Sequence, residues 1–217
     1  MIKGFVFDLD GVITDTAEYH YLAWKKLADD NNWKFTREIN EKLRGVSRLD
    51  SLQIILDYNE VDLSFEEKNR LANLKNTNYI NSLGSITPKD LLPGVKEFLT
   101  ELRDKGYKTS IASASKNANL VLTRLEAKDL FDNISDGNSV ENSKPAPDVF
   151  IHAAGSIGCR AKECVVLEDA AAGVEAGKIA GMKVIGLGSI ETLGAADVVF
   201  KGMYEIDLDF VIKKLTK

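Results

Sequence analysis

Residues 7–16 read FDLDGVITDT and follow a short apolar run, IKGFVF, at residues 2–7. An apolar run of this length that stops at charged residues is typical of a strand buried in a parallel sheet. Asp8 and Asp10 come directly after this predicted strand. Because ligands of open α/β sheets bind outside the carboxyl ends of the strands, the pair is predicted to face a ligand. Aspartates in this position also cap helices, so further motifs in the chain are needed to distinguish ligand binding from helix capping.

The same apolar pattern recurs further along the chain, with helical stretches between its copies. Such alternation predicts an α/β fold with a doubly wound parallel sheet. One helical stretch ends in Gly106, a residue that suits the end of a helix. The further predicted strands are YKTSIAS (107–113), ECVVLED (163–169), MKVIGLG (182–188) and ADVVF (196–200), and the clearest core helices are VKEFLTELRDKG (95–106) and AAAGVEAGKIAGM (170–182).

The segment 15–87 differs from the rest because it is helical throughout and contains no convincing strand. A long helical insertion directly after the first strand predicts a separate helical cap domain. Pro88 and Pro93 bracket the return to the core, since residues before proline are pushed away from helix. We therefore expect a core of residues 1–14 and 88–217 and a cap of residues 15–87.

Composition narrows the class of protein. The hydrophobic fraction of 44% and charged fraction of 28% are those of a soluble globular protein. The chain has no apolar stretch near the roughly 20 residues that span a bilayer, and its start lacks the features of a signal peptide, so we expect no membrane contact and a cytoplasmic location. A net charge of −5 argues against nucleic acid as the main partner. Cys159 and Cys164 are expected to be reduced thiols.

The polar residues that end the predicted strands form a chemical set. Asp8 and Asp10 follow the first strand, Ser113 the second, and Glu168 and Asp169 the third, while Lys144 lies in a loop. Acidic groups that converge at one edge repel each other and usually hold a cation. Oxygen ligands favour a hard ion such as Mg²⁺ over zinc. A carboxylate nucleophile, Mg²⁺, a lysine and a hydroxyl together predict phosphoryl transfer.

Four motifs, which occur in the same order as in a known family, relate this predicted site to that family. FDLDGVITDT, ASAS (112–115), SKPAPD (143–148) and LEDAAAG (167–173) resemble the haloacid dehalogenase (HAD) superfamily. The resemblance implies that Asp8 is the nucleophile and that Asp10 is the general acid/base, with its backbone carbonyl on Mg²⁺. It also implies that Glu168 and Asp169 complete the metal site with Asp8 and Asp10. Ser113 and Lys144 match the residues that hold the phosphoryl group.

A narrower resemblance runs through cap and core. TAEYHYLAWKKLA (16–28), LRGVSRLDSL (43–52) and SASKN (113–117) are similar to the β-phosphoglucomutase family. The resemblance implies a cap loop that closes over a sugar phosphate, with Arg48 on the distal phosphate, because the planar guanidinium meets phosphate oxygens in two places. The family usually has a lysine where this chain has Arg44. The other residues implied in substrate binding are Gly45 and Val46 through their backbone, Ser51 in support of the loop, and Ser115, Lys116 and Asn117 from the core.

The resemblance also implies a gate on hydrolysis. Thr16 and His20 lie at the entrance to the cap and Lys75 lies in its last helix. His20 and Lys75 are expected to engage the acid/base region only when the closed cap holds a sugar, so that Asp10 activates a sugar hydroxyl rather than water. Trp24 is assigned to substrate binding, although a place in the cap core is an equally good interpretation.

The function predicted from this resemblance is interconversion of β-glucose 1-phosphate and glucose 6-phosphate, with Mg²⁺ as cofactor and glucose 1,6-bisphosphate as intermediate, phosphoryl donor and activator. The partner is a small sugar phosphate, and the chain is expected to be a monomer. A HAD-type sugar-phosphate phosphatase remains the main alternative, because it shares every core residue. A mutase for another sugar and a non-catalytic phosphate-binding module are further alternatives, and intact Asp8, Asp10 and Asp169 speak against the last.

Overall fold

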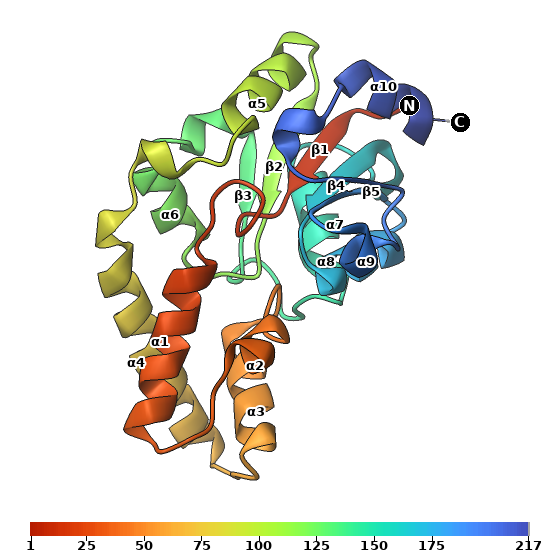
Figure 1. The fold of residues 1–217 in the computed structure, drawn as a ribbon. Coiled ribbons are helices and arrows are strands. Elements are labelled where there is room, and N and C mark those ends of the chain that lie inside the picture. The colour runs from red at the N-terminus through yellow and green to blue at the C-terminus, as the bar shows by residue number, and fades with distance from the viewer. Residues whose placement is uncertain (217) are drawn as a thin grey trace.

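The computed structural model describes residues 1–216 and is built around a parallel six-stranded sheet (Figure 1). The strand order is β3-β2-β1-β4-β5-β6, so the chain builds one half of the sheet outward from β1, then crosses back to build the other. All carboxyl ends therefore meet at one edge, with the end of β1 near its middle. The strands are β1 (Gly4–Phe7), β2 (Lys108–Ala112), β3 (Asn133–Ser135), β4 (Cys164–Glu168), β5 (Lys183–Leu187) and β6 (Val198–Phe200).

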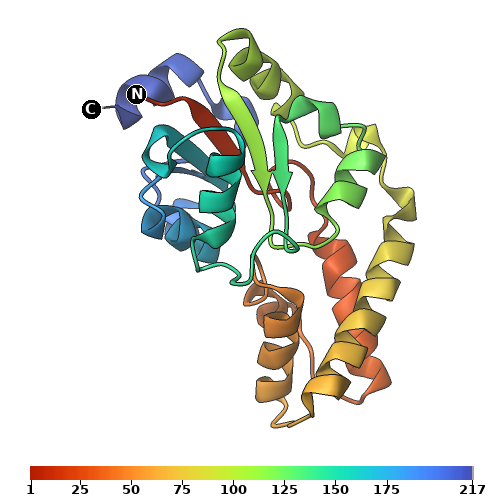
Figure 2. The same ribbon diagram turned by 180° about the vertical axis from the view of Figure 1, so that it is seen from behind.

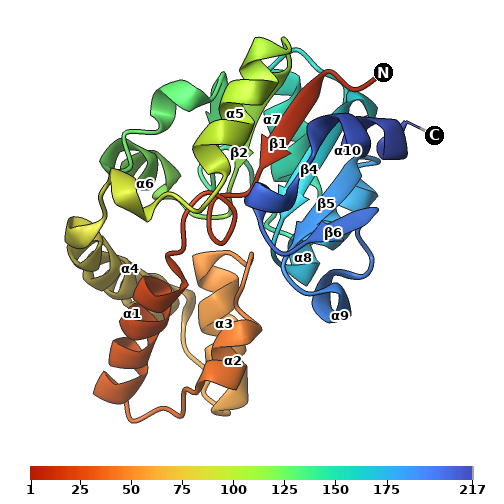
Figure 3. The same cartoon turned by 45° about the horizontal axis from the view of Figure 1, so that its top comes forward.

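Helices cover both faces of this sheet because successive side chains of a strand point to opposite faces. Phe5 and Phe7 belong to one apolar cluster, with α5, α6 and α10, whereas Val6 belongs to the other, with α7 and α8. Figure 3 shows α5 and α10 in front of the sheet and α7 and α8 behind it. The core helices are α5 (Val95–Asp104), α6 (Ala118–Arg124), α7 (Asp148–Ser156), α8 (Ala171–Ile179), α9 (Ile190–Leu193) and α10 (Leu208–Leu215).

The remaining helices form a separate unit at the carboxyl edge of the sheet (Figures 1 and 2). It has an apolar core of its own, in which Trp24, Leu52 and Leu71 are almost fully buried. Leu52 and Leu71 come from neighbouring helices whose apolar faces turn inward, since neither helix can bury that face alone. The helices are α1 (Ala17–Asp30), α2 (Arg37–Glu41), α3 (Arg48–Tyr58) and α4 (Phe65–Ser82).

The predicted fold class, a doubly wound HAD-like sheet with an inserted helical cap, is confirmed by this architecture. The predicted strands are present but shorter than expected, as β1 begins at Gly4 and β6 at Val198. The edge strand β3 was not predicted, because three residues with a polar residue at each end carry no apolar run. Within residues 1–216, no helix is long and apolar enough to cross a membrane.

Candidate active site

A buried ion cluster lies where β1 and β4 end. The Lys144 Nζ atom lies 2.5 Å from Asp8 Oδ1 and 2.8 Å from Glu168 Oε2. All three side chains are buried, with residue exposures of 1%, 5% and 0% respectively. The free carboxylate oxygen of Glu168 accepts a hydrogen bond from the backbone N–H of Ala170 at 3.1 Å. The lysine therefore holds together the carboxylates at the ends of two neighbouring strands, β1 and β4.

Asp169 adds a third carboxylate to this end of the cavity. Carboxylate oxygens of Asp8, Glu168 and Asp169 all lie within 4.8 Å of one another. Gly11, at φ +79°, makes room for this arrangement, since a Cβ there would lie 1.9 Å from Asp169 Oδ2. An all-oxygen set of this kind fits a hard divalent cation. The sequence prediction of a metal site is thus matched by a group of carboxylates that could hold one.

Burial sets the protonation of these carboxyl groups before any cation binds. Burial, followed by the neighbouring Asp8 charge, raises the pKa of Asp169 to about 6. Burial likewise raises the pKa of Glu168 to about 8. It opposes the charge on Lys144, but the Asp8 and Glu168 carboxylates outweigh it and hold the pKa of that ammonium above its usual value. A bound cation would favour the ionised carboxylates and reverse their shifts.

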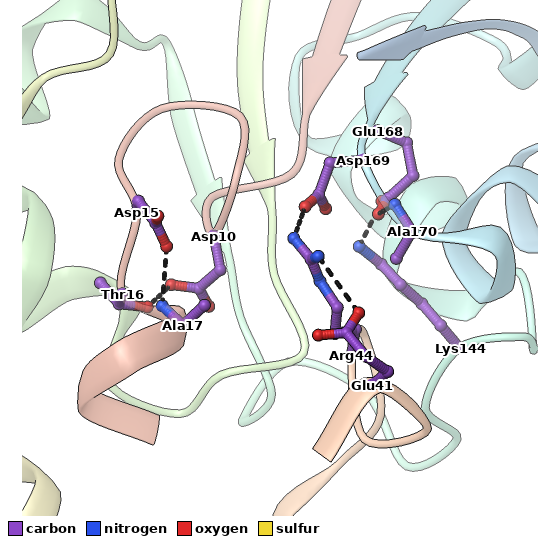
Figure 4. Close-up of polar contacts among 10 residues, drawn as sticks. All are labelled: Asp10, Asp15, Thr16, Ala17, Glu41, Arg44, Lys144, Glu168, Asp169 and Ala170. Carbon is purple, nitrogen blue, oxygen red and sulfur yellow. Dashed lines mark hydrogen bonds and ion pairs between the residues drawn. The ribbon is translucent and has the colours of Figure 1, made fainter. Parts of the chain in front are cut away.

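Asp10 points away from this cluster. Its carboxylate accepts a hydrogen bond from the hydroxyl of Thr16, at the start of the cap (Figure 4). Burial, followed by the Asp8 charge, raises the pKa of Asp10 to about 7. A carboxyl group with that pKa can both donate and accept a proton near neutral pH, as a general acid/base must. Asp10 therefore has the properties expected of the acid/base, and its side chain lies outside the cluster of three carboxylates.

The turn after β2 presents hydroxyl and amide groups to the same cavity. Ser113 Oγ accepts a hydrogen bond from the N–H of Ser115 at 3.1 Å, and Ser115 Oγ accepts one from the N–H of Asn117 at 3.2 Å. Successive serine–backbone bonds of this kind stabilise a tight turn. The Asn138 side chain, on the neighbouring loop, donates to the carbonyl of Lys116 at 3.3 Å. The turn that carries Ser115, Lys116 and Asn117 is therefore held firmly to the core.

The cap loop before α3 faces this turn across the cavity. Ser47 caps α3 by accepting a hydrogen bond from the N–H of Asp50, which places Arg48 in the first turn of the helix. Arg48 is half-buried, and burial lowers the pKa of its guanidinium. Among the residues that the structure describes, it has no carboxylate within ion-pair distance, whereas Arg44 pairs with Glu41 and with Asp169. The surface pairing of Arg48 with Glu41 or Asp50, a plain alternative to phosphate binding, is absent within residues 1–216.

A second cation enters the cavity from α4. The Lys75 Nζ atom lies 2.8 Å from His20 Nδ1 and 4.8 Å from the ring centre of Trp24. Burial, followed by the charge of Arg48, lowers the pKa of Lys75 to about 7. Burial, followed by the charge of Lys75, lowers the pKa of His20 well below its usual value. Trp24 is 2% exposed and packs in the cap core. Its ring contacts the Lys75 ammonium and also forms part of the cavity lining.

Core and cap together enclose a cavity of about 600 Å³. It brings together most of the residues selected from the sequence. Thr16 and Glu168 do not line it and lie buried behind Asp10 and Lys144. The selected residues that line it are Asp8, Asp10, His20, Trp24, Gly45, Val46, Arg48, Ser51, Lys75, Ser113, Ser115, Lys116, Asn117, Lys144 and Asp169.

Contacts between cap and core were not foreseen from the sequence. The guanidinium of Arg44 reaches Asp169 (Figure 4), and the hydroxyl of Ser143 donates to Asp50 at 2.7 Å. The side-chain amide of Asn117 donates to that of Asn76 at 2.7 Å. Each contact joins residues far apart in the chain, so no local pattern could have indicated it.

Comparison with known proteins agrees with this geometry. The family model of haloacid dehalogenase-like hydrolases matches residues 5–187, and the chain belongs to that family. The β-phosphoglucomutase of Bacillus subtilis is 40% identical over 212 residues, which are 97% of this chain and 94% of that protein. A crystal structure of β-phosphoglucomutase from Clostridium difficile covers all of this chain and 98% of its own, with a TM-score of 0.96 and 39% identity. Within the family, the chain therefore belongs with the β-phosphoglucomutases.

Phosphatases of the same family are more distant. The fructose-1-phosphate phosphatase of Escherichia coli is 30% identical over 184 residues, which are 84% of this chain and 94% of that protein. A phosphorylated-carbohydrate phosphatase of Thermotoga maritima is 26% identical over a similar length. Both relatives are named as phosphatases of phosphorylated sugars.

Proposed function

We propose that the protein interconverts β-D-glucose 1-phosphate and glucose 6-phosphate as a β-phosphoglucomutase, an intramolecular phosphotransferase of the isomerase class. One observation carries the proposal: the cavity has Lys144 and a group of carboxylates suited to Mg²⁺ at its core end, and further cations without a carboxylate partner elsewhere in its lining. Arg48, Lys75 and Lys116 line it, and none has a carboxylate within ion-pair distance in residues 1–216. Lys75 is buried and Arg48 is half-buried, and such cations without a carboxylate partner suit an anionic ligand. A mutase needs two phosphate sites, whereas a phosphatase needs only one.

The first half-reaction transfers a phosphoryl group from Asp8 to the sugar. The bond between phosphorus and the Asp8 carboxylate breaks, and a bond forms between phosphorus and the sugar C6 oxygen. Asp10 takes the proton of the C6 hydroxyl, a role for which a pKa of about 7 is well suited. Ser113 and Lys144 hold the oxygens of the phosphoryl group while Arg48, Ser115, Lys116 and Asn117 hold the phosphate on C1.

The second half-reaction is the reverse transfer from the other end of the intermediate. Glucose 1,6-bisphosphate turns over in the cavity, so that its C1 phosphate faces Asp8. The phosphoryl group returns to the Asp8 carboxylate, the C1 oxygen receives the proton from Asp10, and glucose 6-phosphate leaves. Added glucose 1,6-bisphosphate would act as the donor that first phosphorylates Asp8.

Mg²⁺ fits the site because three carboxylates converge within 4.8 Å and offer only oxygen ligands. Asp8, Glu168, Asp169 and the backbone carbonyl of Asp10 are the proposed ligands. When bound, Mg²⁺ neutralises charge on the transferring phosphoryl group. Lys144 supplies a second positive charge that is already in place, since it is bonded to Asp8.

The cap residues provide the proposed gate against hydrolysis. Thr16 holds the Asp10 carboxylate, and the Lys75–His20 pair stands at the cap side of the cavity. A sugar phosphate that binds Arg48 would draw the cap onto the core and bring Asp10 to the sugar hydroxyl. Gly45 and Val46 contact the sugar through their backbone, and Ser51, which is 3% exposed, supports their loop. Water alone cannot make these contacts, so the closed state favours the sugar as acceptor.

We further propose that the protein works as a monomer in the cytoplasm on small sugar phosphates, without nucleic acid or membrane partners. Cap and core of one chain complete the cavity, so no second subunit is needed for the site. Both cysteines are free and buried, which suits a reducing compartment.

The decisive experiment supplies β-glucose 1-phosphate, Mg²⁺ and a trace of glucose 1,6-bisphosphate, and follows glucose 6-phosphate and free phosphate together. Rapid formation of glucose 6-phosphate with little free phosphate supports the mutase. Abundant free phosphate would support the phosphatase alternative and leave the role of Asp8 intact. Metal-dependent labelling of Asp8 by a phosphoryl donor distinguishes either enzyme from a phosphate-binding module.

A further inference from the structure

One contact across the cavity joins the two walls through side-chain amides. Asn117, on the turn after β2, donates from Nδ2 to Oδ1 of Asn76 on α4 at 2.7 Å. Both side chains line the cavity and are half-buried. A hydrogen bond in such a place is only partly screened by water and depends on the distance between cap and core.

Asn117 makes this bond in place of a local one. It is the N-cap residue of α6, a position in which an asparagine side chain normally accepts a hydrogen bond from the first turn of its own helix. No such capping bond is present, and the side chain extends to the cap instead. The orientation therefore follows from the cap contact and not from the needs of α6.

The residue before Asn76 on α4, Lys75, connects this contact to the proposed gate. Lys75, the preceding residue on α4, binds His20 at 2.8 Å. One turn of helix thus carries both the cation of the proposed gate and the partner of the proposed distal-phosphate clamp. A movement that aligns Asn76 with Asn117 moves Lys75 with it, because consecutive helical residues are rigidly connected. His20 lies on α1 and is coupled to this movement through its hydrogen bond to Lys75.

The remaining hydrogen-bonding capacity of the pair suits an anion. Each amide offers two N–H donors and one oxygen. One N–H and one oxygen are used in the Asn76–Asn117 bond, so three N–H donors remain, whichever way the two amides are oriented. A carboxylate at position 76 could accept the same bond from Asn117, but it would place a negative charge beside the phosphate.

We propose that Asn76 is a positioning residue that links the distal-phosphate clamp to the cap, so that filling the clamp and placing Lys75–His20 at the reaction centre are one event. The inference rests on the proposed function and identifies how the two phosphate sites communicate. Asn76 acts through Asn117, and it need not touch the reacting atoms.

The test compares N76A, N76D and N117A with T77A, a control at the next, exposed position of α4 that does not line the cavity. N76A is expected to lower kcat/KM for β-glucose 1-phosphate about 10-fold, the effect of one partly buried hydrogen bond. The ratio of free phosphate to glucose 6-phosphate should rise, because loss of the link slows transfer to sugar and leaves hydrolysis of the phosphoenzyme unchanged. Simple destabilisation would lower both rates together and leave the ratio constant.

Two further measurements separate the link from a general role of the side chain. In the N117A background, N76A is expected to have no added effect, because the partner is already absent. N76D keeps the bond to Asn117 but should raise KM by at least another factor of about 10, through repulsion of the phosphate. Full additivity of N76A and N117A, or an unchanged product ratio in N76A, would overturn the inference.

Calorimetry with glucose 6-phosphate keeps this test apart from that of the proposed function. N76A should weaken binding about 10-fold in the wild-type background and not in N117A. A wild-type enzyme that binds glucose 6-phosphate without interconverting the two sugar phosphates would contradict the proposed function, while the binding cycle would still decide on the link. Equal affinities of wild type and N76A would contradict the link alone.

Discussion

The two walls of the cavity are built in opposite ways. In the core wall, Lys144 is buried between Asp8 and Glu168 and pairs with both, and Asp169 adds a third carboxylate within 4.8 Å of these two. In the cap wall, Arg48 and Lys75 have no carboxylate partner among the described residues, and the Lys75 ammonium rests on a neutral histidine and aromatic rings. The core wall has an excess of negative charge that a divalent cation would balance, whereas the cap wall has positive charge that an anion would balance.

This difference suits the core wall to phosphoryl transfer and the cap wall to selection of the substrate. A preorganised core wall can stabilise a transferring phosphoryl group without rearrangement. An unbalanced cap wall gains most when a phosphate enters, so its binding energy is available to close the cap. Family members with similar cores and different substrates are expected from such a division, and the phosphatase relatives fit it.

Removing the nucleophile should cause the largest loss. D8N keeps the size of the side chain but cannot form the acyl phosphate, so mutase activity should fall by at least about 10⁴-fold. Phosphorylation of the protein by glucose 1,6-bisphosphate should disappear in the same variant, as measured by intact mass. A D8N protein that still takes up a phosphoryl group would show that the core wall has been misread.

Removing the arginine of the cap wall should affect binding more than folding. R48A is expected to lower kcat/KM for β-glucose 1-phosphate about 10²-fold, because charged hydrogen bonds to phosphate contribute about 1.5–3 kcal/mol. The matched control is R37Q, since Arg37 pairs with Glu18 on the cap surface and does not line the cavity. Equal losses in both variants would mean that Arg48 acts on cap stability alone.

The buried lysine of the cap wall should show itself in the pH dependence of stability. Its pKa is depressed to about 7 in the folded protein from 10.5, so the folded state binds fewer protons than the unfolded state between these values. Its contribution to stability is therefore present above about pH 10.5 and is lost as the pH falls through about 7.

Urea unfolding between pH 7.5 and 9.5 measures this contribution. The wild-type free energy of unfolding should gain up to about 1.4 kcal/mol per pH unit relative to K75M, the slope for one proton. K68M is the control, because Lys68 lies on the same helix, with Asp62 at 3.7 Å as its partner. Parallel pH curves for wild type and K75M would contradict a depressed pKa at Lys75.

The smallest expected effect concerns Arg44, a cap residue that pairs with Asp169 of the core. Arg44 pairs with Asp169, a proposed Mg²⁺ ligand, and its side chain is 40% exposed. R44Q should tighten Mg²⁺ binding by a few-fold, because removal of a competing cation at a partly exposed pair is worth no more than about 1 kcal/mol. Titration calorimetry with Mg²⁺ on the substrate-free protein measures it, with K42Q as a nearby control. Weaker Mg²⁺ binding in R44Q would show that Arg44 supports the metal site.

The sequence by itself determined the parts that depend on local pattern. Short apolar runs ending in Asp8, Ser113 and Glu168 predicted parallel strands, and parallel strands place their carboxyl ends at one edge. The identity of the core cluster followed from this rule. The helical insertion after β1 was also readable, because several stretches within 15–87 look helical and none looks like a strand.

Only the tertiary structure determined which partner each charged group has. Periodicity says which residues share a face, but it is silent on distances between segments that meet after folding. Hence the position of Lys144 between Asp8 and Glu168 emerged from the packing of core segments. The contacts of Arg44 with Asp169 and of Asn76 with Asn117 emerged from the packing of cap on core. The short edge strand β3 was missed for a related reason, since pairing with β2, and not its own residues, makes it a strand.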